Sequence, residues 1–131
     1  MEAVYIAGWC NMMYRTLGRT GLRVSALGFG GMRFPDDADL ETNAALVLEA
    51  YAGGINYFDT APAYGRSEDI FGLALREMKK QAAARPYYVS TKSSADTADG
   101  VRRDLDNSLR RMGLDAVDFF HVWCVYHPQD Y

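Results

Sequence analysis

The stretch GINYFDTAPAYGRSEDIFGLAL, residues 54–75, reads as a strand, a loop and a helix in that order. Its apolar start, Ile55–Asp59, is short and bounded by turn residues, which is typical of a strand buried on both faces. A loop rich in Pro and Gly follows. Ser67 can then cap a helix whose first acids, Glu68 and Asp69, favour the positive end of the helix dipole. This unit predicts a parallel α/β fold.

The same strand–helix unit recurs along the chain with a period of roughly thirty residues. The expected strands are residues 26–30, 55–59, 87–91 and 117–123, and the expected helices are residues 40–52, 68–78 and 101–112. Strands that alternate with helices at this spacing indicate βαβ units and a parallel sheet, with the helices outside it. Before the first unit, residues 14–24 predict a small hairpin, in which Leu17 and Leu22 could cover one end of the sheet.

The composition of the 131-residue chain is that of a globular protein, with 49% apolar and 24% charged residues. Its net charge of −3 argues against a general nucleic-acid-binding protein, whose surface is usually basic. No apolar run approaches the ~18–20 residues of a membrane span. Cys10 and Cys124 lack metal-ligand spacing and suit unpaired thiols in a reducing cytosol, so we expect a cytoplasmic protein.

Two further features concern the ends of the expected domain. Residues 1–13 show no periodic pattern and are expected to be a leader outside the core, which then comprises residues 14–131. The last expected helix carries four arginines that lie mostly off its apolar stripe: Arg102, Arg103, Arg110 and Arg111. We expect them to form a solvated helix face rather than a phosphate-binding patch.

Polar side chains follow the expected strands at the points where they end. Asp59 ends the second strand, Tyr64 lies in the loop after it, Lys92 follows the third strand, and His121 lies in the fourth. Ligands of parallel α/β folds gather at the carboxyl ends of the strands, so these groups are expected to converge. A nearby ammonium favours the phenolate form of a tyrosine, and a carboxylate holds a lysine charged and in place. The set predicts a proton relay aimed at one acceptor oxygen.

The glycine-rich stretch Gly28–Met32 follows the first strand, as a dinucleotide-binding turn would. Arg33 stands where the Rossmann pattern needs its third glycine, and no helix is expected directly after the stretch. We interpret it as a strand end whose backbone lies close to another group, such as a ligand.

Four stretches resemble the aldo-keto reductase family, and together they cover nearly all of residues 14–125. They are YRTLGRTGLRVSALGFGGMRF (14–34), GINYFDTAPAYGRSEDIFGLAL (54–75), YVSTK (88–92) and LRRMGLDAVDFF (109–120). The resemblance implies a (β/α)8 barrel that binds NADP(H) across its C-terminal mouth. It also implies a hydride transfer between the nicotinamide and a carbonyl carbon, with Tyr64 as proton donor, Lys92 lowering its pKa and Asp59 pairing with Lys92.

The same resemblance implies where the cofactor binds and how the catalytic set is completed. Gly30, Gly31 and Met32, together with Asp59, would lie near the nicotinamide half of NADP(H). The family usually has a fourth catalytic residue, a histidine, at the position that Trp123 occupies here. His121 could substitute for it from one layer deeper, because residues i and i+2 of a strand face the same side, or Trp123 could shape the substrate pocket. A metal site is not expected.

A complete barrel of this kind needs ~250 residues. The expected fold is therefore α/β, a partial (β/α)8 barrel with an N-terminal hairpin, four parallel strands and three intervening helices. The expected function is NADP(H)-dependent reduction of aldehydes or ketones to alcohols, with weak or no NADP(H) binding by this chain alone. An alternative is a non-catalytic half barrel that self-associates, or joins a complementary chain, through unpaired sheet edges. A different α/β enzyme fits less well, because of Arg33 and the Asp–Tyr–Lys set.

Overall fold

The computed structural model describes residues 12–127 apart from residues 37, 82 and 83. The predicted leader, residues 1–13, lies outside the described residues except for its last two. The elements in chain order are β1 (Tyr14–Thr16), β2 (Arg23–Ser25), β3 (Phe29–Gly30), η1 (Gly31–Arg33), α1 (Leu40–Ala52), β4 (Tyr57–Asp59), α2 (Ser67–Lys80), β5 (Tyr88–Ser93), α3 (Ala98–Met112) and β6 (Phe119–Val122). In the described part of the chain, no helix is both long and apolar enough to cross a bilayer.

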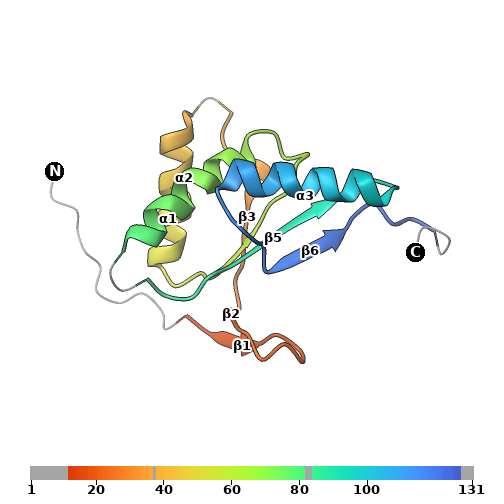
Figure 1. The fold of residues 1–131 in the computed structure, drawn as a ribbon. Coiled ribbons are helices and arrows are strands. Elements are labelled where there is room, and N and C mark those ends of the chain that lie inside the picture. The colour runs from red at the N-terminus through yellow and green to blue at the C-terminus, as the bar shows by residue number, and fades with distance from the viewer. Residues whose placement is uncertain (1–11, 37, 82–83, 128–131) are drawn as a thin grey trace, which may run out of the picture.

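The centre of the molecule is a four-stranded parallel sheet in the order β3-β4-β5-β6. One helix follows each of the first three strands, and all three helices lie on the same side of the sheet (Figure 1). The prediction of an N-terminal hairpin, four parallel strands and three intervening helices is therefore confirmed. The arrangement is half of a (β/α)8 barrel, in which the sheet forms part of the inner wall.

The sheet curls toward the side that carries no helices. On that side the rings of Tyr57 in β4 and Phe119 in β6 lie 5.5 Å apart between centroids, although β5 runs between their strands. Strands two places apart in a flat sheet are separated by about 9.6 Å, twice the spacing of neighbours. Side chains from β4 and β6 meet more readily when the sheet bends around them, as it does in a barrel wall.

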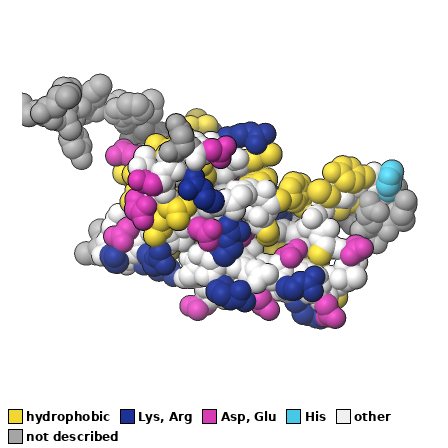
Figure 2. All heavy atoms as spheres, turned by 90° about the horizontal axis from the view of Figure 1, so that it is seen from above, with side chains coloured by type: hydrophobic (Ala, Val, Ile, Leu, Met, Phe, Trp, Pro, Cys, Tyr) yellow, Lys and Arg dark blue, Asp and Glu magenta, His cyan; other side chains and the backbone are white. Residues whose placement is uncertain are grey.

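The hydrophobic core lies between the sheet and the helices. Four phenylalanine rings from β3, β4, α2 and the segment after η1 pack together in it, with contacting centroids 5.9–6.3 Å apart: Phe29, Phe34, Phe58 and Phe71. Phe58 and Phe71 are fully buried. Seen from the helix side, charged side chains of both signs cover the outer surface, as expected for solvated helix faces (Figure 2).

The hairpin of β1 and β2 was predicted correctly and packs near the amino end of β4 (Figure 1). Polar contacts hold it there. The Asn56 side chain accepts a hydrogen bond from the Ser25 amide and donates one to the Arg23 carbonyl, and the Tyr14 hydroxyl donates to the Gly54 carbonyl at 2.8 Å. Leu17, which was expected to help cover the sheet, is exposed instead.

The start of α2 differs from the prediction. Ser67 is the first residue of the helix rather than its cap, and the cap residue Arg66 makes no side-chain capping bond. The Ser67 hydroxyl instead hydrogen-bonds the Thr60 hydroxyl at 2.7 Å, in a site that is fully buried. A polar group at this depth needs a partner inside the protein, and Thr60 at the end of β4 supplies it.

Candidate active site

An ion pair joins the carboxyl ends of β4 and β5. The Lys92 ammonium lies 2.9 and 2.8 Å from the two oxygens of Asp59, and it also donates to the Thr60 carbonyl at 2.8 Å. The Ser90 hydroxyl donates to Asp59 Oδ1 at 2.7 Å. The side chain of Lys92 is only 10% exposed, so these oxygens replace the water that the ammonium loses on burial. The predicted pairing of Asp59 with Lys92 is present.

Tyr64 lies above this ion pair. Its backbone amide donates to the Ala61 carbonyl at 3.0 Å, which closes the turn that brings the side chain back over the strand ends. The Lys92 ammonium is 4.8 Å from the centre of the Tyr64 ring, which places the cation against the face of the aromatic ring. The structure thus brings Asp59, Tyr64 and Lys92 together at one spot, although Lys92 lies within β5 rather than after it.

His121 and Trp123 occupy different places around this group. His121 is the register partner of Lys92 on the neighbouring strand, and its side chain is exposed. Trp123 lies one residue beyond β6, and its amide still donates to the Ser93 carbonyl at 2.9 Å. Its ring meets the Tyr64 ring edge to face, with centroids 5.9 Å apart. Of these two residues, Trp123 is the one in ring contact with Tyr64.

The glycine-rich strand end adjoins the same site. Gly30 pairs in register with Asp59, and a Cβ added to Gly30 would meet nothing within 4 Å. At Gly31 a Cβ would come within 2.2 Å of the Ser67 hydroxyl and 2.4 Å of the Phe71 ring. The close approach expected at this stretch is therefore made by α2. The short 3-10 turn η1 begins within the stretch, at Gly31, and the next helix, α1, begins only at Leu40, so no helix follows the stretch directly, as predicted.

A cavity of about 320 Å³ opens between η1 and the loop that carries Tyr64. Its lining includes Met32, Arg33, Tyr64 and Arg66. Arg66 is held in place because it donates to the backbone carbonyls of Asp36 and Ala38. A small molecule bound in this cavity would lie against Tyr64. Across the residues that the structure describes, no three His, Cys, Asp or Glu side chains are grouped so that they could hold a metal ion.

A polar network that the sequence did not predict lies behind the site. Arg111 was expected on a solvated face, but it forms ion pairs with Glu68 and Asp69 at 3.0 and 2.8 Å, whereas Arg102, Arg103 and Arg110 are exposed as predicted. Glu68 is completely buried. The hydrogen bonds from Arg111 hold the pKa of Asp69 below its usual value, and the same bonds raise the pKa of Arg111.

The pKa of Asp69 makes a testable contribution to stability. The pKa of Asp69 is lower in the folded than in the unfolded chain, so the carboxylate contributes its full stabilisation at pH values above the unfolded pKa of 3.8. This contribution is lost as the pH falls through the folded pKa. We expect Asp69→Asn to lower the free energy of unfolding at pH 7 by less than about 1 kcal/mol, since the Asp69 side chain is 43% exposed and solvent screens the pair. Urea titrations of both proteins should show this difference shrinking below pH 4. A difference that stays constant down to pH 2.5 would contradict the assignment.

Comparisons with known proteins point to one family. A sequence model of the aldo/keto reductase family matches residues 26–131. L-galactose dehydrogenase of Arabidopsis thaliana is 41% identical over 119 residues, which cover 82% of this chain and 36% of that protein. L-glyceraldehyde 3-phosphate reductase of Escherichia coli K12 is 38% identical over 127 residues, with 85% and 36% covered.

Solved structures show the same likeness in three dimensions. A putative aldo-keto reductase from Pseudomonas aeruginosa superposes with a TM-score of 0.71 at 35% identity, over 84% of this chain and 46% of that one. An aldo-keto reductase from Bacillus halodurans, in its holo form, gives 0.73 at 27% identity, over 85% and 40%. The chain spans less than half the length of these relatives. The matched family and the shared fold lead to one conclusion: this chain belongs to the aldo/keto reductase family.

Proposed function

We propose that this chain carries the proton-donating site of an NADP(H)-dependent reductase that converts aldehydes or ketones to alcohols. The observation that carries the proposal is the cluster of Asp59, Lys92 and Tyr64, in which a buried ammonium is held by a carboxylate on one side and faces a phenol ring on the other. Such a cluster supplies a proton to one oxygen and stabilises the charge left on the phenol.

Each residue has a distinct task in this reaction. The Tyr64 hydroxyl donates its proton to the carbonyl oxygen of the substrate. The Lys92 ammonium stabilises the phenolate that remains, and Asp59 holds the ammonium in place while balancing its charge. Trp123, in edge contact with Tyr64, limits how the substrate can approach the phenol. His121 is a candidate for a second polar contact from the neighbouring strand.

The site fits a nicotinamide cofactor on chemical grounds. When bound, NADPH supplies the hydride that carbonyl reduction requires at carbon, and Tyr64 can supply the proton required at oxygen. Gly30 lies beside Asp59 with open space where a side chain would be, so the backbone there can approach a flat ring closely. We propose that Gly30, Met32 and Asp59 hold the nicotinamide half, while Gly31, from the same stretch, packs against α2 and supports Gly30 from behind. The free thiol of Cys124 favours a reducing compartment, and we propose the cytoplasm.

The test is carbonyl-dependent oxidation of NADPH by this chain, with Tyr64→Phe as the matched variant. Because few contacts to the cofactor are expected, NADPH is supplied at millimolar concentration with a panel of small aldehydes and ketones. We expect Tyr64→Phe to lower the rate by about a hundredfold, the lower range for losing a general acid. The variant keeps the ring, so its contacts with Lys92 and Trp123 remain. An equal rate in both proteins would remove Tyr64 as the acid.

A second candidate function is assembly with another copy or a complementary chain. The strands at the two edges of the sheet, β3 and β6, each have one neighbour among the described strands. Val122 at the end of β6 is 72% exposed, and hydrophobic side chains gather toward the C-terminal end of the molecule (Figure 2). Unpaired edges with exposed apolar residues favour association. Light scattering after gel filtration tests this candidate, and a monomer across the micromolar range would contradict self-association.

A further inference from the structure

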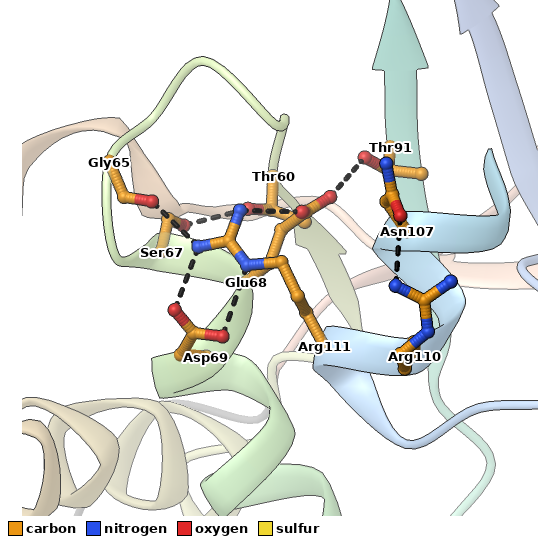
Figure 3. A network of polar contacts seen from close by, with 9 residues as sticks. All are labelled: Thr60, Gly65, Ser67, Glu68, Asp69, Thr91, Asn107, Arg110 and Arg111. Atoms are coloured by element: carbon orange, nitrogen blue, oxygen red, sulfur yellow. Dashed lines mark hydrogen bonds and ion pairs between the residues drawn. The ribbon is translucent and has the colours of Figure 1, made fainter. Parts of the chain in front are cut away.

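The polar network behind the site is centred on Arg111 at the end of α3. Its guanidinium donates to both oxygens of Asp69, at 3.0 and 2.8 Å, and to Glu68 Oε2 at 3.0 Å. It also donates to the Gly65 carbonyl at 2.7 Å. Figure 3 shows this one side chain reaching the first turn of α2 and the loop before it at the same time. A planar fork with several fixed donors can do this, whereas an ammonium group cannot.

Glu68 connects this arginine to the sheet. Its side chain is 1% exposed, and its other oxygen, Oε1, accepts a hydrogen bond from the Thr91 hydroxyl at 3.0 Å (Figure 3). A carboxylate at this depth is tolerated only when its partners replace the lost water. Arg111 and Thr91 are those partners, so α2, α3 and β5 are joined through one buried group.

Three residues that the network contacts or adjoins are each next in sequence to a residue of the proposed site. Thr91 precedes Lys92, and Gly65 follows Tyr64. Thr60 follows Asp59, bonds the Ser67 hydroxyl behind the sheet, and accepts from the Lys92 ammonium through its carbonyl. Successive residues of a strand face opposite sides, so the network contacts the helix side of the strands whose other side carries the ion pair.

We propose that Arg111 and Glu68 are positioning residues, which set the loop bearing Tyr64 at a fixed place relative to Lys92 and Asp59. That this placement matters for catalysis rests on the proposed function. The placement itself is a structural feature and can be tested without any activity. The ring of Tyr64 sits 4.8 Å from the Lys92 ammonium, and the Gly65 carbonyl next to it is held by Arg111. When Arg111 no longer binds the Gly65 carbonyl, the loop that carries Tyr64 becomes more mobile, while the ion pair between Lys92 and Asp59 remains.

The experiment is amide hydrogen exchange by NMR on wild type and Arg111→Lys. The reporters are the amides of Tyr64 and Ser67, which bond the Ala61 and Tyr64 carbonyls within the loop. Arg111→Lys keeps the charge but loses the forked geometry, and we expect both amides to exchange about tenfold faster. We also expect the nuclear Overhauser contact between the rings of Tyr64 and Trp123 to weaken.

The matched control is Arg110→Lys, one residue away on α3. Arg110 is exposed, and among the residues that the structure describes its side chain bonds that of Asn107, within its own helix (Figure 3). It should leave both reporter amides and the ring contact as in wild type. A purely structural role for Arg111 predicts a different pattern, in which amides throughout α2 and α3 accelerate together, in step with the drop in urea midpoint.

The outcomes separate this proposal from the proposed function. Unchanged exchange at Tyr64 and Ser67 in Arg111→Lys, or acceleration spread over both helices, would overturn the positioning role. If Arg111→Lys does not fold, Asp69→Asn decides instead, because Asp69 accepts from the same Arg111 nitrogen, Nη2, that donates to the Gly65 carbonyl. We expect about threefold faster exchange at the two amides, and no change there would overturn the proposal. A wild-type chain without carbonyl-dependent turnover would count against the proposed function alone.

Discussion

Lys92→Met is expected to lower carbonyl-dependent NADPH oxidation by about a thousandfold, which is within the range for loss of proton-transfer catalysis. The expected loss exceeds that of Tyr64→Phe, because two things fail together. The phenolate formed at Tyr64 loses the cation that faces its ring, and Asp59 is left as an unpaired carboxylate in the same cluster. A negative charge there opposes the negative charge that develops on the phenol.

The same variant should also destabilise the fold by about 2–4 kcal/mol. Removing one member of a buried ion pair leaves the other charge buried without a partner, which lowers the free energy of unfolding. The loss is moderate here, because the Asp59 side chain is 33% exposed and still accepts a hydrogen bond from Ser90. Urea unfolding at pH 7 measures this loss of stability independently of the reaction rate. A stability equal to wild type would contradict the buried character of the pair.

A double variant separates the two effects. Asp59→Asn in the Lys92→Met background removes the orphaned charge, so most of the lost stability should return. The rate should not return, because the cation facing Tyr64 is still missing. Lys80→Met serves as the control for charge: Lys80 is 70% exposed in a pair with Glu77 on α2, and its removal should change neither quantity measurably. Recovery of the rate in the double variant would contradict the role given to Lys92.

The main features of the fold were predictable because their signals are local. Short apolar strands ended by Asp or Lys, and helices with one apolar stripe, can be found in windows of about ten to fifteen residues. The parallel topology then follows from general rules on βαβ connections. Those rules also place strand ends on one edge of the sheet, so the meeting of Asp59, Lys92 and Tyr64 could be predicted from the sequence.

The network behind the site could not be predicted in this way. Arg111 and Glu68 are 43 residues apart, and their pairing depends on how two helices lie on the sheet. An arginine off the apolar stripe gives the same sequence signal whether it meets water or a buried acid. Gly31 is a similar case, because a glycine indicates a close approach without indicating that α2, rather than a ligand, makes it.

The interface between α2 and α3 that carries this network gives a second large expected effect on folding. Gly72 in α2 is buried, and a Cβ there would come within 2.5 Å of the Arg111 carbonyl oxygen and 3.2 Å of the Met112 Cα. Both atoms belong to the backbone of α3, so they cannot move aside as a flexible side chain would. We expect Gly72→Ala to lower the free energy of unfolding by about 2–3 kcal/mol through overpacking.

The sign of this effect is diagnostic, because intrinsic helix propensity predicts the opposite. Alanine in a helix interior is favoured over glycine by about 1 kcal/mol, so Gly72→Ala would stabilise the chain if α2 and α3 were not in backbone contact. Gly53→Ala is the matched control: Gly53 ends α1 at φ −69°, and a Cβ there would meet only ordinary contacts at 3.4 and 3.5 Å. It should be neutral or stabilising by up to about 1 kcal/mol. Because the clash at Gly72 displaces the backbone of Arg111, Gly72→Ala should also accelerate amide exchange at Ser67. Stabilisation by Gly72→Ala would show that the two helices do not pack closely enough for α3 to hold the loop that carries Tyr64.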